Sequence, residues 1–224
     1  SGTTTTKELH VTDSSTIDKN LTVKGDSSTT GNQTVGGNST VNGNSETKGN
    51  STTDGSSTVK GDQTVGGTTN TTNLNVSGDT NLHNTTITGD SHVTNNQTVD
   101  GSSTVKGDSN VGGNENVSGT TTTKELHVTD SSTIDKNLTV KGDSETKGNS
   151  TTDGSSTVKG DQSVAGTTTT KELHVTDSAT VDKNLTVSGN TETKGNNTVD
   201  GNQTVSGDSS TTGNQTVGGK ETVK

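Results

Sequence analysis

The hexapeptide Asn-Gln-Thr-Val-Gly-Gly at residues 32–37 returns as Asp-Gln-Thr-Val-Gly-Gly at 62–67, and this pattern decides the fold. Its valine belongs to a series of 33 positions, from Val11 to Val223, that holds every Val and Ile of the 224-residue chain. Twenty-three of these lattice positions are Val, three are Ile and seven are Thr, and 28 of the 32 intervals between them are six residues long. A strict short repeat is typical of stacked identical units and not of a globule around one core.

Numbering the hexad so that the lattice residue is position 4 predicts which side chains are buried. Side chains alternate along an extended strand, so positions 2 and 4 share one face and positions 3 and 5 share the other. Position 4 is branched, and seven of the eight Leu stand at position 2, whereas positions 3 and 5 carry Thr, Glu, Lys, Asp and Asn. We therefore expect positions 2 and 4 to face inward and positions 3 and 5 to face water.

The end of each hexad carries a turn signal. Twenty-five of the 30 Gly stand at position 6, and Asn or Asp commonly follows at position 1. Both residue types tolerate positive φ, which predicts a tight corner. β-branched residues favour strands and glycine disfavours helices, so each hexad is expected to form a short strand followed by a corner.

Short strands joined by identical corners predict an all-β, hexapeptide-repeat β-helix or β-prism rod. Two versions fit the pattern. The favoured version is an intertwined triple-stranded homotrimer, because a lone coil would bury Gln, Ser and Thr in a thin core of its own. The alternative is a single-chain left-handed hexapeptide β-helix in which three hexads make one turn. Residues 1–224 are expected to form one continuous repetitive fibrous shaft with no separate globular domain.

Four lattice intervals are eleven residues long, and they end at Val76, Ile87, Val128 and Val175. Each contains two hexads minus one residue. Two interpretations stay open: a tightened corner or local change of winding, and a tolerated deletion.

Composition limits the classes of function. Only 16% of residues are apolar, none is aromatic, and there is no Arg or Cys. The net charge of −10 is spread along the chain, which disfavours nucleic-acid binding. The sequence has no apolar run long enough for membrane insertion.

No residue pattern indicates catalysis, so we expect no enzyme, no catalytic, cofactor-binding or metal-binding residues and no cofactor. His10, His92, His127 and His174 each precede a lattice residue and should point outward, while His83 follows Leu82. A nine-residue aspartate ladder typical of calcium-binding β-rolls is not matched by this six-residue repeat. Ice binding would require flat Thr-x-Thr ranks at positions 3 and 5, and double Thr is rare there.

Several runs resemble the shaft repeats of tailed-bacteriophage tail fibres. They are Asn20-Leu-Thr-Val-Lys-Gly25, Asn184-Leu-Thr-Val-Ser-Gly189 and Asn214-Gln-Thr-Val-Gly-Gly219. Proteins of this kind are typically trimeric, fibrous and β-structured, with a receptor-binding tip elsewhere.

The resemblance implies a structural shaft or spacer that holds a host-recognition tip away from the virion. It implies an extracellular, virion location and partners that are further copies of the chain and other fibre or baseplate proteins. The alternative function is the stalk of a bacterial extracellular filament or a trimeric adhesin. The block Thr3–Asp26 recurs unchanged at Thr120–Asp143, so such a shaft could be lengthened by duplication.

Overall fold

The computed structural model describes residues 2–224, and all of its regular structure is β-strand. The strands pair in parallel and stack as a β-solenoid of about 12 turns. Two compact units are present, Ser1–Gly113 (unit 1) and Asn114–Lys224 (unit 2). The all-β repeat structure predicted from the hexads is therefore confirmed, while the continuity of residues 1–224 as one shaft stays a prediction.

Unit 1 contains fourteen strands, most of them three residues long. They are β1 (Thr3–Thr6), β2 (Leu9–Val11), β3 (Ser15–Ile17), β4 (Asn20–Val23), β5 (Ser27–Thr29), β6 (Gln33–Val35), β7 (Ser39–Val41), β8 (Ser45–Thr47), β9 (Ser51–Val59), β10 (Gln63–Val76), β11 (Thr80–Ile87), β12 (Ser91–Val93), β13 (Gln97–Val99) and β14 (Ser103–Val111).

Unit 2 contains sixteen strands of the same kind. They are β15 (Glu115–Val117), β16 (Thr120–Val128), β17 (Ser132–Ile134), β18 (Asn137–Val140), β19 (Ser144–Thr146), β20 (Ser150–Val158), β21 (Gln162–Val164), β22 (Thr168–Val175), β23 (Ala179–Val181), β24 (Leu185–Val187), β25 (Thr191–Thr193), β26 (Asn197–Val199), β27 (Gln203–Val205), β28 (Ser209–Thr211), β29 (Gln215–Val217) and β30 (Glu221–Val223).

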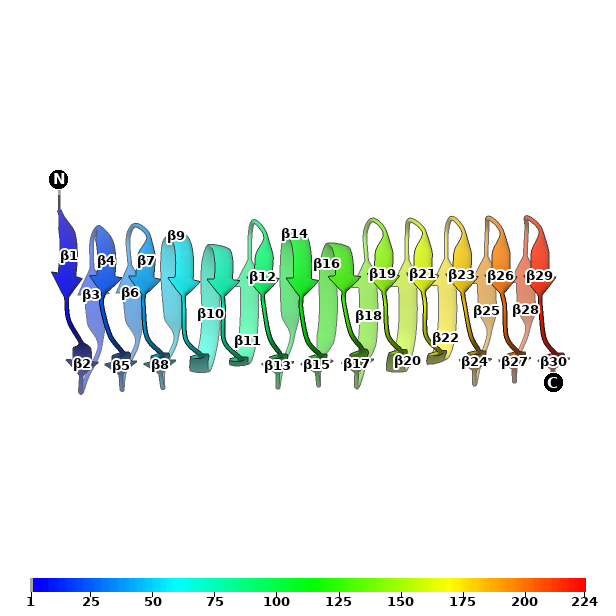
Figure 1. Ribbon diagram of the computed structural model, residues 1–224, viewed down its shortest axis with the longest axis horizontal. Coiled ribbons are helices and arrows are strands. Elements are labelled where there is room, and N and C mark those ends of the chain that lie inside the picture. Colours follow the sequence, from blue (N-terminus) through cyan, green and yellow to red (C-terminus); the bar gives the residue numbers. More distant parts are fainter. Residues whose placement is uncertain (1) are drawn as a thin grey trace. The chain divides into compact units, whose positions relative to one another are not determined.

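Strand pairing within each unit follows a step of three hexads. Leu21 of β4 is opposite Ser39 of β7, and Leu185 of β24 is opposite Gln203 of β27. Successive turns therefore lie side by side in the same direction, as the neighbouring strands of unit 1 illustrate (Figure 1). This register within one chain is the arrangement of the single-chain alternative, and it does not test the intertwined homotrimer.

The burial of the side chains confirms the facing predicted from the hexad. In β6, Gln33 and Val35 are buried and Thr34 between them is partly exposed. The same alternation recurs in β27, where Val205 is fully buried. The interior of each unit thus consists mainly of lattice residues at position 4 and of Leu, Ser, Thr, Gln, Asn, Ala and Glu at position 2.

Each eleven-residue interval contains one corner that lacks its glycine. Each interval contains an additional inward residue after six positions, namely Thr71, Leu82, Thr123 or Thr170, and the next lattice residue follows after five more. The pairing step becomes one residue shorter than three hexads at these places, as between Ser57 and Leu74. The structure therefore shows a tightened corner at these places, and the tolerated deletion stays an open interpretation of its origin.

A threonine hydroxyl closes three of these short corners. Oγ1 of Thr71 donates to the carbonyl oxygen of Asn73 at 2.9 Å, and Oγ1 of Thr170 donates in the same way to Glu172 at 2.9 Å. Thr123 makes the equivalent hydrogen bond to Glu125 at 2.7 Å. Each of these threonines is the last inward residue before the short corner, and its hydroxyl donates to the carbonyl group two residues further on. This hydrogen bond stabilises a corner that is one residue shorter.

Candidate functional site

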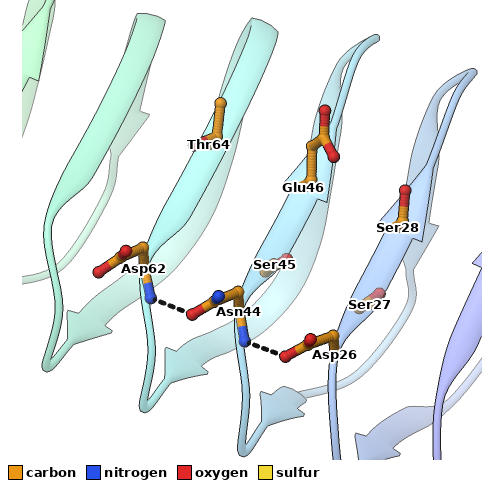
Figure 2. Close-up of a pocket in the computed structure, with 8 residues that line it drawn as sticks. All are labelled: Asp26, Ser27, Ser28, Asn44, Ser45, Glu46, Asp62 and Thr64. Atoms are coloured by element: carbon orange, nitrogen blue, oxygen red, sulfur yellow. Dashed lines mark hydrogen bonds between the residues drawn. The ribbon is translucent and has the colours of Figure 1, made fainter.

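Hydrogen-bond ladders made by the Asn and Asp side chains of position 1 run along the corners of each unit. In one such ladder Oδ1 of Asp26 accepts from the backbone N–H of Asn44 at 2.8 Å, and Oδ1 of Asn44 accepts from the N–H of Asp62 at 2.9 Å (Figure 2). Unit 2 repeats the arrangement, with Asn184 Oδ1 accepting from the Asn202 N–H at 2.9 Å.

The side chain of Asp26 takes part because the carbonyl oxygen of this residue accepts from the N–H of Leu9 at 3.1 Å, on the side away from Asn44. The N–H of Gly43 donates to the carbonyl oxygen of Gly25 at 3.0 Å, and the next N–H, that of Asn44, has the side chain of Asp26 as its acceptor. Buried or half-buried backbone groups need such partners. The sequence showed the period of these residues but not this role.

The corner glycines are required by space and not by φ. No described residue, glycine included, has a positive φ, so the predicted corner forms without the left-handed conformation that Gly and Asn tolerate. A Cβ on Gly43 would instead meet Oδ1 of Asp26 and lie 2.8 Å from the carbonyl carbon of Gly25. The close approach of the preceding turn therefore excludes any larger side chain at this position.

An open hollow of about 430 Å³ lies over one face of unit 1 and has three exposed carboxylates around it. Asp26, Glu46 and Asp62 belong to three successive turns, and Figure 2 shows the side chain of Glu46 directed away from the two corner aspartates. Among residues 2–224, no three His, Cys, Asp or Glu side chains gather closely enough to hold a metal ion.

The histidines lie on the outward faces, as predicted. In unit 2, Nδ1 of His127 lies 3.0 Å from Oε2 of Glu145, and Nδ1 of His174 lies 2.9 Å from Oε2 of Glu192. Beside His174, the hydroxyl of Ser155 donates to Glu172 at 3.1 Å, within a second hollow of about 180 Å³. The acceptor of this serine is a carboxylate and not an imidazole, so the pair lacks the arrangement of a nucleophile with its base.

Single-file threonine ranks cover parts of the outward surface. In unit 2, position 3 of successive turns brings six threonines into one rank: Thr133, Thr151, Thr169, Thr186, Thr204 and Thr222. Their companions at position 5 are Asp, Lys and Ser. The double ranks that ice binding would use do not form on this face.

Many interior polar groups have no hydrogen-bond partner, which the sequence argument about a lone coil anticipated. Gln97 has neither amide atom paired, and the hydroxyls of Ser27 and Thr193 are also unpaired. Other interior groups are paired, as where Nδ2 of Asn197 donates to Oε1 of Gln203 at 3.0 Å.

Glu115 is the one charged side chain that is buried among residues 2–224, and sequence reasoning missed it. It occupies position 2 of its hexad, is 1% exposed, and neither carboxylate oxygen has a partner. Burial raises the pKa of the Glu115 carboxyl to about 7, because the charged form loses its hydration. Its place two residues before Val117 was the signal that could have identified it.

Comparison with known proteins gives no relative from which a role could be carried over. No protein-family model matches the chain, and no curated protein or solved structure matches it. Within residues 2–224 no helix is long and apolar enough to cross a membrane. The expectation of no catalytic, cofactor-binding or metal-binding residue stays a prediction.

Proposed function

We propose that this chain is a structural spacer, the shaft segment of a tailed-phage tail fibre that holds a host-recognition tip away from the virion. The support is the resemblance of its hexads to fibre-shaft repeats together with a fold that consists of repeated turns. In this role the surface only has to stay soluble, which the net charge of −10 favours.

The observation that carries the proposal is the behaviour of the duplicated block. In unit 1, Thr3–Asp26 forms β1 to β4, and in unit 2 the identical Thr120–Asp143 forms strands at the same positions, with the first two joined into β16. Ser15–Ile17 corresponds to Ser132–Ile134, for example. A block that folds into the same turn at two places can be added or removed to set length, which is what a spacer requires.

Two assemblies of such a spacer stay in competition. The unpaired interior polar groups favour the intertwined homotrimer, in which strands from three chains would share one core. The three-hexad register favours the single-chain coil, because each strand finds its backbone partners within its own unit. We favour the single-chain coil, since backbone pairing is the larger requirement.

The location can be tested with antibodies raised against residues 1–224. Immunogold labelling of purified phage particles from the source culture should mark the tail fibres. Labelling confined to bacterial envelopes would overturn the virion proposal and favour the alternative, a stalk of an extracellular filament or adhesin. Other fibre or baseplate proteins are the expected partners and should co-purify with the labelled particles.

A further inference from the structure

Each unit contains one turn whose interior consists almost wholly of hydroxyl groups. In unit 1 this turn is made by β8 and β9, and its inward residues are Ser45, Thr47, Ser51, Thr53, Ser57 and Val59. In unit 2 it is made by β19 and β20, with Ser144, Thr146, Ser150, Thr152, Ser156 and Val158 inward. We call these two the hydroxyl turns.

The hydroxyl turns are buried. Thr47 is 1% exposed and Thr53 is 5% exposed, and even Ser45 is only 9% exposed. In unit 2, Ser156 is 1% exposed and its hydroxyl has no hydrogen-bond partner. Each hydroxyl carries one donor and two acceptor sites, so the five inward hydroxyls of a turn could together hold a small polar ligand.

The neighbouring turn of unit 2 shows that the same backbone can enclose large side chains. The turn before Ser144–Val158 places Leu126, Val128, Ile134, Leu138 and Val140 inward, with Ser132 as its one polar member. We call it the apolar turn. Ser132 pairs with Ser150 of the hydroxyl turn, so the two turns lie on one ladder. On this ladder Ser144 is opposite Leu126 and Ser156 is opposite Leu138, so the hydroxyl turn has smaller and more polar side chains at the same places. Polar interior space, where it is large enough, is occupied by water in proteins.

We propose that each hydroxyl turn is an interior binding site for ordered water, held by the three serine and two threonine hydroxyls of that turn. A buried water needs two to four polar partners, which the five hydroxyls supply. The site occurs twice because the stretch that encodes it, residues 45–69, recurs at 144–168 with two changes. The duplicated stretch therefore supplies a hydration site together with its strands.

Water-oxygen magnetic relaxation dispersion tests this on the intact chain, because it counts internal waters with long residence times. The variants Ser51→Leu and Ser150→Leu should each lower the count by at least one, and the double variant should lower it further. Ser163→Leu changes an exposed serine of β21 and should leave the count unchanged. Wild-type protein without long-lived water, or an unchanged count in both interior variants, would overturn the proposal.

Thermal unfolding gives a second readout that does not depend on counting waters. Ser150→Leu should keep or raise the melting temperature because it fills a wet space, whereas Ser132→Leu should lower it because the apolar turn is already packed. An equal fall of the melting temperature in both variants, or failure of Ser150→Leu to fold, would show that the hydroxyl turn is already packed and has no room for water. Either result would overturn the proposal. A melting temperature that rises with potassium but not with choline at equal ionic strength would indicate that a bound cation occupies the turn. That result would overturn the assignment of water.

Discussion

At the scale of single residues, the facing of the hexad decides which substitutions matter. Val205 is fully buried, so Val205→Asp would place a charge in an apolar interior and should cost several kcal/mol, on the order of 3 or more. Lys60 is exposed, and Lys60→Ser should change stability by about 0.5 kcal/mol or less. Chemical denaturation measures both values, and equal shifts would contradict the assigned facing.

The buried carboxyl of Glu115 links stability to pH. Its pKa of about 7 in the folded chain lies above its ordinary value of 4.5, so the folded chain binds the proton more tightly. The stabilisation is full below about pH 4.5 and is lost as the pH rises through 7, which amounts to ~3 kcal/mol. Urea titrations between pH 4 and pH 8 should therefore show falling stability of unit 2.

Glu115→Gln provides the control for this pH dependence. Glutamine already stands at the same hexad position in Gln162 and Gln203, where it is buried. The variant should remove most of the change in stability between pH 4.5 and pH 7. An identical pH profile in the wild type and the variant would show that other groups cause the dependence.

At the scale of the corner, the glycine acts by leaving room for the preceding turn. Gly43→Ala would bring a methyl group against Asp26 and the backbone of Gly25, and overpacking of this kind should cost roughly 1–3 kcal/mol. Gly2→Ala is the control, since the nearest atom to its added Cβ is Cγ of Lys19 at 3.9 Å. Melting temperatures of the two variants compare them directly, and similar values would rule out the steric explanation.

The short corner depends on its threonine. Thr170→Val would remove the hydrogen bonds that the hydroxyl donates to the carbonyl oxygens of Glu172 and Gly154, and it should cost about 1 kcal/mol. Thr193→Val is a matched change of the same volume, but the Thr193 hydroxyl is buried without a partner, so this variant should be neutral or more stable. Denaturant unfolding should therefore show a loss of stability in Thr170→Val alone, and a destabilised Thr193→Val would contradict the assignment.

At the scale of the whole molecule, the pairing step sets size and assembly together. A chain that coils alone gains one inter-strand spacing per three hexads, which gives roughly 60 Å, while an intertwined trimer gains one per hexad and reaches roughly 170–180 Å. We expect sedimentation equilibrium to give the single-chain mass of 22.5 kDa. A particle of three chains with the longer dimension in electron micrographs would establish the intertwined trimer instead.

The sequence by itself determined the strand period, the inward positions and the repeated turn. These follow because a side chain alternates along a strand regardless of what the strand pairs with, so Val35 and Val205 could be placed in the interior from spacing alone. The period of the corner residues could be recognised from the sequence in the same way.

Only the tertiary structure decided what those corner residues do and which strands pair. The side chain of Asp26 has its acceptor role because Asn44, three hexads further along the chain, lies on the next turn, and Gly43 is needed because that turn comes close. Thr71 and Thr170 were not recognised as inward residues, since the corner glycine that would have kept the period is missing. These features depend on contacts between turns, and a hexad has the same sequence whether its neighbour is the same chain or another.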